Sequence, residues 1–183
     1  MIRRFVLSGL IALASVGASA QTTLHYREGQ RVDPEEVRQI LEKAPDAAGT
    51  TRSIRLLASR PESGGASQPA KTPDALSLPV RFEFDSAKIT SSARGQLDAL
   101  AEGIKLLPPD RAVVIEGHTD ARGSAPYNDG LSARRAEAVK SYLVETHGIA
   151  AQRLQAVGVG KQQPIEGSDP YAGENRRVQF RGG

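Results

Sequence analysis

Two charged side chains occupy positions where each needs a partner. Arg135 falls within the apolar arc of a predicted helix, beside Leu131 and Leu143, on a helical wheel at ~100° per residue. A guanidinium in a stripe that faces the core must be paired, because an unpaired buried charge is costly. Asp120 follows a short apolar run and precedes a loop. Its carboxylate can therefore meet Arg135 where a strand, a loop and a helix join.

Such a pair of charges supports two interpretations. A carboxylate and a guanidinium that face one cavity can bind an amino-acid zwitterion, with Asp120 receiving the ammonium and Arg135 holding the carboxylate in a bidentate contact. Alternatively, the two residues form a structural ion pair, and spacing alone does not separate these readings. We expect the helix over 131–146 to begin about one turn before Arg135, so that its terminal amides also attract anions. Arg134 lies outside the arc and is predicted to face solvent.

A catalytic alternative uses His118, Asp120 and His147 as a metal or acid–base site. His147, however, stands in the last turn of a helix before Gly148, where an imidazole is favourable at the negative end of the helix dipole. His118 ends a strand and orders the loop that follows. No zinc motif, nucleophile–base pair or phosphate loop accompanies these residues. We therefore predict a protein that is not an enzyme and has no catalytic residues, no metal site and no cofactor.

The elements that position these residues lie between 80 and 181. Apolar and polar residues alternate over 80–84 and 177–180, which indicates half-buried strands. Helical spacing of apolar residues and shorter apolar runs mark the other elements, namely helices over 90–107 and 131–146 and strands over 112–115 and 154–157. The order predicts an α/β fold, an α+β sandwich of β-α-β-α-β-β type with helices on one face of a mixed sheet.

Residues 1–20 have the features of a secretory signal. Arg3 and Arg4 give a basic start, and the uncharged apolar run over 5–16 is ~12 residues long, whereas a membrane span needs ~20. Ala18-Ser19-Ala20 supplies the small residues that signal peptidase accepts. We predict cleavage after Ala20, export, and no transmembrane segment in the mature chain.

Two further segments separate the signal from the main domain. Residues 21–58 predict a small extension with a helix that begins at Asp33-Pro34 and a strand over 51–57. This extension either packs on the main domain or docks a partner protein. Residues 59–79 are rich in Ser, Gly, Ala and Pro and cannot bury enough surface to offset the entropy of ordering, which predicts a disordered linker.

Composition excludes several classes of function. The chain contains no cysteine, which excludes disulfides, thiolate–metal sites and lipid attachment through cysteine. The chain has 24 basic and 21 acidic residues. Without Arg3 and Arg4 the balance becomes 22 to 21, and so small an excess gives no field strong enough to gather phosphates. We therefore expect no nucleic-acid partner.

Several short motifs follow one another in a specific order, namely Phe84-Asp85-Ser86, Gly117-His118-Thr119-Asp120, Asn128-x-x-Leu131-Ser132-x-x-Arg135-Ala136, Gly148-Ile149 and Asn175-Arg176-Arg177-Val178. Together they resemble the OmpA-like peptidoglycan-binding domain that outer-membrane protein A, peptidoglycan-associated lipoprotein and flagellar stator proteins share. The resemblance covers roughly residues 80–181, the length of one domain.

This resemblance implies a periplasmic protein of a Gram-negative cell envelope, associated with the outer membrane. Its ligand would be the meso-diaminopimelate moiety of the peptidoglycan stem peptide, bound to tether or organise the envelope. The principal ligand residues would be Asp120 and Arg135, with Asn128, Arg176 and Thr119 in the same site. Ala87 is a departure, because relatives can offer a polar side chain there. The alternative is an envelope adaptor whose segment 21–58 docks a partner protein complex.

Overall fold

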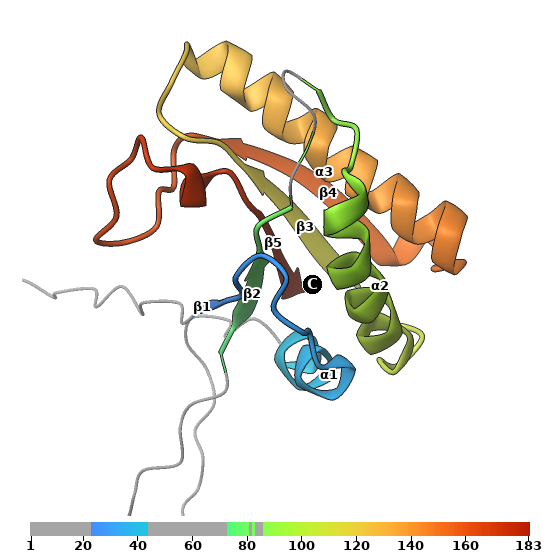
Figure 1. Ribbon diagram of the computed structural model, residues 1–183. Coiled ribbons are helices and arrows are strands. Elements are labelled where there is room, and N and C mark those ends of the chain that lie inside the picture. Colours follow the sequence, from blue (N-terminus) through green and yellow to red (C-terminus); the bar gives the residue numbers. More distant parts are fainter. Residues whose placement is uncertain (1–22, 44–72, 81, 83–85) are drawn as a thin grey trace, which may run out of the picture.

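A five-stranded mixed sheet forms the framework of the protein (Figure 1). The computed structural model describes residues 23–43, 73–80, 82 and 86–183. Their strand order is β1-β2-β5-β3-β4, in which β1 runs parallel to β2, β3 runs parallel to β4, and β5 is antiparallel to both of its neighbours. The elements in chain order are β1 (Thr23–His25), α1 (Pro34–Glu42), β2 (Ala75–Leu78), α2 (Ser91–Lys105), β3 (Val113–His118), α3 (Ala125–His147), η1 (Ala151–Arg153), β4 (Leu154–Gly160), η2 (Gly173–Asn175) and β5 (Val178–Gly182).

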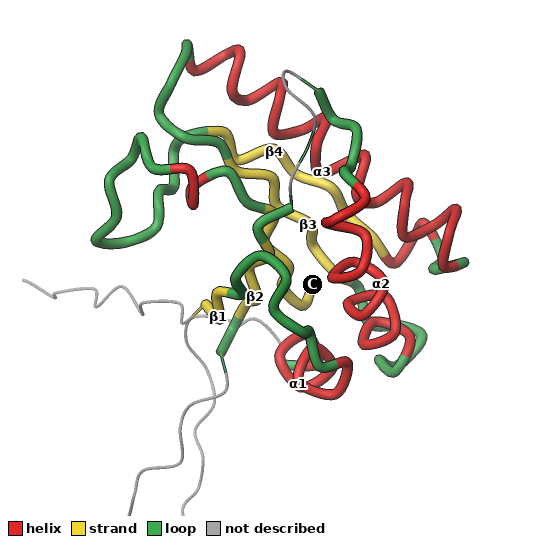
Figure 2. Tube along the Cα trace, viewed as in Figure 1, coloured by secondary structure: helices red, strands yellow, loops and turns green. Residues whose placement is uncertain are grey.

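The helices cover one face of this sheet, as the sequence predicted. A side chain at Gly117 of β3 would point at Ser132 of α3, and one at Gly182 of β5 would point at Leu41 of α1. Gly117 and Gly182 lie on the same face, because Gly182 pairs with Val113 of β3. Figure 2 shows the helices beside the strands, with the long loop from β4 to η2 at one end of the sheet.

One hydrophobic core joins the sheet to all three helices. On the helix-covered face, β2 and β5 contribute Leu76, Leu78 and Phe180, which are completely buried. The helices contribute the rest of the core, including Val37 and Leu41 from α1, Leu97, Leu100 and Ile104 from α2, and Val139 and Leu143 from α3. The burial predicted for Val178 and Phe180 in the last strand is therefore confirmed, but Arg177 and Gln179 are buried as well, so the strand is not half-exposed. On the opposite face of the sheet, Arg181 pairs with Glu116.

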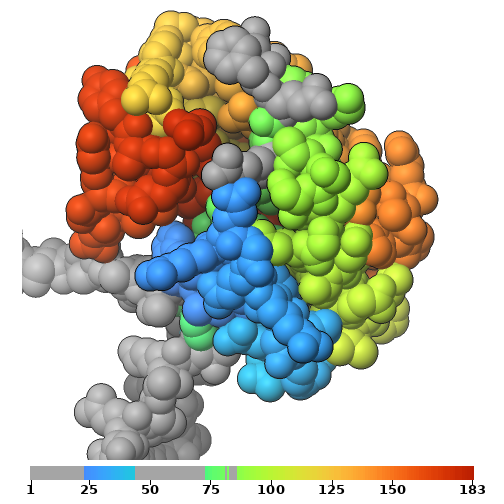
Figure 3. Space-filling view, viewed as in Figure 1, coloured from blue at the N-terminus to red at the C-terminus, as the bar shows by residue number. Residues whose placement is uncertain are grey.

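The described part of the N-terminal extension belongs to this core. Asp33 caps α1, its Oδ1 accepting a hydrogen bond of 2.9 Å from the backbone N of Glu35. The apolar face of α1 packs on α2 and β5, and β1 adds a strand beside β2. Figure 3 shows this N-terminal segment, in blue, against the green of α2. Of the two roles considered for 21–58, packing on the main domain is confirmed for 23–43, and the strand predicted over 51–57 lies outside the described residues.

The prediction of a disordered linker over 59–79 is wrong at its C-terminal end. Residues Ala75–Leu78 form β2, with all four residues buried between β1 and β5. Only four residues long and flanked by Pro73 and Pro79, this strand gains its stability from two distant partners rather than from a strong local pattern. The strand predicted over 80–84 is also displaced: Phe82 makes only an isolated bridge with Ile89, and residues 81 and 83–85 are not described. The linker residues 59–72 lie outside the described part as well.

The helix that carries Arg135 begins six residues earlier than predicted. α3 starts at Ala125, with Ser124 as its N-cap and Pro126 in its first turn. Proline is favourable there, because the first turn needs no intrahelical N–H bond. Arg135 therefore lies nearly three turns inside α3. The expectation that the terminal amides of this helix attract an anion beside Arg135 is wrong. The predicted C-cap is confirmed, since Gly148 adopts φ 69°.

Candidate functional site

Asp120 lies just beyond the end of β3 and is only 7% exposed. Its Oδ2 accepts a hydrogen bond of 2.7 Å from Nη1 of Arg176, and its Oδ1 accepts one of 3.1 Å from the backbone N of Arg122. Nη1 of Arg122 stands 3.7 Å from the same Oδ2. The two ion pairs described at this carboxylate thus join it to Arg176 and Arg122, not to Arg135 as spacing had suggested.

Arg135 is half-buried, and the segment before α2 holds its guanidinium in place. Its Nε donates a hydrogen bond of 3.3 Å to the carbonyl oxygen of Ser86. Its Cζ lies 4.9 Å from the centre of the Phe82 ring, in the range of a cation–π contact. Arg134 is exposed, as the helical wheel predicted. Of the two neighbouring arginines, Arg135 is therefore the one directed toward the interior of the domain.

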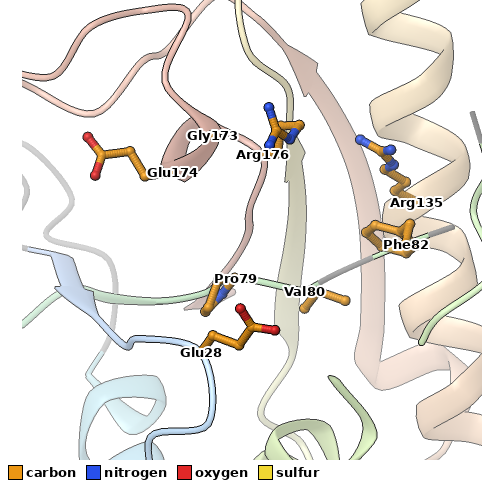
Figure 4. Close-up of a pocket in the computed structure, with 8 residues that line it drawn as sticks. All are labelled: Glu28, Pro79, Val80, Phe82, Arg135, Gly173, Glu174 and Arg176. Atoms are coloured by element: carbon orange, nitrogen blue, oxygen red, sulfur yellow. The ribbon is translucent and has the colours of Figure 1, made fainter. Parts of the chain in front are cut away.

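A cleft of about 380 Å³ lies in front of Arg135 and Arg176 (Figure 4). Its walls come from the turn after β1, the segment after β2, helix α3 and the region of η2, with Glu28, Pro79, Val80, Phe82, Arg135, Gly173, Glu174 and Arg176 as its lining residues. Arg135 and Arg176 both contribute to the lining, but Asp120 is not among those residues. The structure therefore presents two guanidinium groups to the cleft and sets the buried carboxylate beside one of them.

Asn128 and Thr119 hold the loop that carries Asp120. The Asn128 side chain, 2% exposed in α3, donates through Nδ2 to the carbonyl oxygens of Arg122 (2.7 Å) and Ser124 (3.1 Å). The backbone N of Thr119 donates to the carbonyl oxygen of Gly160 at 2.9 Å. The Thr119 hydroxyl is buried and has no hydrogen-bond partner among the residues that the structure describes. Both residues are close to Asp120 in the chain, and the described contacts give them a supporting role in the loop.

The interior next to this loop is unfavourable for additional positive charge. Burial and the positive charge of Arg177 lower the pKa of His118 to about 3. Burial also lowers the pKa of Arg177 to about 10. The backbone N of His118 donates to the carbonyl oxygen of Arg177 at 2.9 Å, so the two residues are neighbours across β3 and β5. The imidazole of His118 is thus neutral near pH 7 and is poorly placed to act as an acid.

The catalytic arrangement weighed for His118, Asp120 and His147 is not assembled. His147, at the far end of α3, places its Nε2 2.9 Å from Oδ1 of Asp98, and Tyr142 donates to the same oxygen at 2.6 Å. These contacts tie α3 to α2. Within the ranges that the structure describes, no group of three or more His, Cys, Asp or Glu side chains could hold a metal ion.

Six of the eight lining residues, among them Phe82 and Glu28, were missed by the sequence reasoning. Phe82 belongs to a predicted strand, and its alternation pattern indicated only burial. Glu28 lies in the N-terminal extension, far from the motifs in the sequence, and no local pattern marks it. Only the folding of 23–43 onto the main domain brings Glu28 to the cleft.

The open mixed sheet and its helical cover define a small α/β domain with a charged cleft. Residues 81–177 match the model of the OmpA family, and the chain belongs to that family. Within the described ranges, no helix combines the length and apolar character needed to cross a bilayer.

Relatives and solved structures agree with this assignment. The chain is 40% identical over 102 residues to the peptidoglycan-associated lipoprotein of Pseudomonas aeruginosa (55% of this chain, 59% of that protein). It is 37% identical over 106 residues to outer membrane porin F of the same species (57% of this chain, 30% of that protein). The match thus spans less than two thirds of either relative.

Among solved structures, the peptidoglycan-associated lipoprotein of Burkholderia pseudomallei has a TM-score of 0.50 and 34% identity, covering 58% of this chain and 89% of that one. The periplasmic domain of Helicobacter pylori MotB has a TM-score of 0.51 and 25% identity, covering 59% and 80%. None of these relatives bears the name of an enzyme.

Proposed function

We propose that the domain binds peptidoglycan without catalysis, at the meso-diaminopimelate moiety of the stem peptide. The observation that carries this proposal is the pair of guanidinium groups, Arg135 and Arg176, at a cleft of about 380 Å³ with the buried Asp120 bonded to one of them. The names of two relatives, each a peptidoglycan-associated lipoprotein, support the choice of polymer. The protein would act in the periplasm, exported by a signal cleaved after Ala20, and would tether or organise the cell envelope.

The free end of a diaminopimelate side chain is a zwitterion, and this site offers charges of both signs. Arg135 holds the ligand carboxylate from a fixed position, because Ser86 and Phe82 restrain its guanidinium. Arg176 stands at the same cleft and shares that role. Asp120 orients Arg176 and supplies negative charge for the ammonium, and Asn128 and Thr119 keep its loop in place.

Co-sedimentation of the mature protein with purified sacculi tests this function. Arg135→Ala and Asp120→Ala should each weaken binding about tenfold or more, because a charge-assisted hydrogen bond contributes ~1.5–3 kcal/mol. Arg134→Ala is the matched control, since the neighbouring arginine is exposed and lines no part of the cleft. Binding should also weaken as salt is raised. Equal losses for Arg134→Ala and Arg135→Ala would refute the assignment of the site.

A further inference from the structure

One wall of the cleft comes from outside the segment that defines the family. The family match covers residues 81–177, whereas Glu28 lies in the turn between β1 and α1. It nevertheless lines the same cleft as Arg135 and Arg176. In Figure 4 the Glu28 carboxylate turns toward Val80, with the two guanidinium groups at the other end of the cleft. An acidic side chain of the N-terminal extension is thus part of the candidate binding site.

The turn that carries Glu28 is fastened at several points. The backbone N of Gln30 donates to the carbonyl oxygen of Arg27 at 3.0 Å, which closes a four-residue turn with Glu28 at its second position. Gly29 follows with φ 72°, a conformation that favours glycine.

The turn is also fixed to α2. The amide of Gln96, a buried residue, donates through Nε2 to the carbonyl oxygens of Arg27 (2.8 Å) and Gln30 (2.9 Å). The position of Glu28 is therefore set by the fold, as a ligand-contacting residue requires.

The charges of the cleft match a ligand that carries both signs. Of the residues that the structure describes, the charged ones in its lining are two arginines, Arg135 and Arg176, and two glutamates, Glu28 and Glu174. Figure 4 shows the Glu174 side chain extending away from the other labelled residues, whereas that of Glu28 turns toward them. Asp120 is buried, bonded to Arg176 and not part of the lining. Among the described residues, Glu28 therefore adds a second carboxylate, from the lining of the cleft, to the negative charge that Asp120 contributes beside Arg176.

We propose that Glu28 is a specificity-determining residue, which makes the cleft prefer a ligand with a free ammonium group beside its carboxylate. This inference rests on the proposed binding of peptidoglycan. Removing the negative charge of Glu28 would make the cleft more positive, which favours an anion over a zwitterion. With that charge in place, a group that has lost its ammonium and kept its carboxylate meets a repelling charge, and the zwitterion is selected.

The test compares native sacculi with sacculi whose free amino groups have been acetylated, which converts each zwitterionic end into an anion. The full mature chain should bind native sacculi more tightly than acetylated ones. Glu28→Gln should weaken binding to native sacculi about twofold to fivefold, as expected for an exposed charge contact, and leave binding to acetylated sacculi equal or stronger. Glu174→Gln, a change of the same chemistry in the same cleft, should preserve the wild-type preference.

The outcomes separate this inference from the proposed function. If Arg135→Ala abolishes binding while Glu28→Gln keeps the full preference for native sacculi, peptidoglycan binding stands and the role of Glu28 is refuted. A wild-type protein that binds both preparations equally also refutes it. If the wild-type protein binds neither, the proposed function falls first. A loss of preference in Glu28→Gln, but not in Glu174→Gln, supports the inference.

Discussion

Replacing Gly117 by alanine tests the contact on which the geometry of the cleft depends. Gly117 lies in β3 three residues before Asp120, and it faces Ser132, which lies in α3 three residues before Arg135. A Cβ atom at position 117 would stand 2.2 Å from the carbonyl oxygen of Ser132 and 3.0 Å from its carbonyl carbon, whereas ordinary contact begins at 3.4 Å. Both are backbone atoms, so no change of rotamer relieves the clash.

The required displacement sets the size of the effect. Restoring contact to the oxygen needs a shift of 3.4 − 2.2 = 1.2 Å between β3 and α3. Over-packing of a core costs ~1–3 kcal/mol, and more where backbone must move, so we expect a loss of about 3 kcal/mol in the free energy of unfolding. The same shift moves Arg135 relative to Asp120 and Arg176, and should therefore weaken binding to sacculi as well.

Urea denaturation and co-sedimentation of one preparation measure both effects. Gly95→Ala is the matched control, because Gly95 is exposed within α2 and a Cβ atom there meets nothing within 4 Å. That variant should gain about 0.5–1 kcal/mol, since alanine is favoured over glycine inside a helix, and its binding should not change. A Gly117→Ala variant as stable as the wild type would show that α3 does not pack tightly on β3, and would refute this account of how the site is held.

Two further predictions concern buried groups near the site. Burial and the charge of Arg177 lower the pKa of His118 to about 3 in the folded protein. Below pH 6.5 the unfolded chain therefore binds a proton that the folded protein does not bind. The contribution of His118 to stability is complete above pH 6.5 and is lost as the pH falls toward 3. Between pH 8 and pH 5, the free energy of unfolding of the wild type should therefore fall by about 2 kcal/mol more than that of His118→Gln. Urea unfolding of both proteins at both pH values measures this difference. Equal acid sensitivity of the two proteins would contradict the burial of this imidazole. Ser132→Ala should cost about 1–3 kcal/mol in thermal unfolding, because the Ser132 hydroxyl accepts from the backbone N of Gly160 at 2.9 Å and its loss leaves a buried donor unpaired. An unchanged melting temperature would show that this amide does not need the hydroxyl.

Elements with local start and stop signals could be predicted from the sequence. Asp33-Pro34 marks the start of α1, and Gly148 marks the end of α3, because capping depends on residues within one turn of the helix end. The start of α3 was missed because proline usually interrupts a helix, although Pro126 stands in the first helical turn, where proline is favourable. β2 was missed because its four residues form a strand only between β1 and β5, whose residues are remote in the sequence.

The candidate site was predictable only in part, for the same reason. The inward direction of Arg135 follows from its place in an apolar arc, since helical periodicity is a local property. The partner of Asp120 cannot be inferred from a local pattern, because Arg176 lies 56 residues away and reaches Asp120 only when the region of η2 folds back beside β3. Glu28 is more distant still, in a segment where neither motif nor periodicity indicated a binding role. Contacts of this kind depend on tertiary folding, which one sequence read locally does not specify.

The place of β5 in the sheet has a consequence for biosynthesis. β5 is the last of the described strands to emerge from the ribosome, yet it sits in the middle, between β2 and β3. Until it arrives, β1 with β2 and β3 with β4 are two separate ribbons that share no described backbone pairing. Because β5 joins these two ribbons, cooperative closure of the sheet must wait until β5 has been translated.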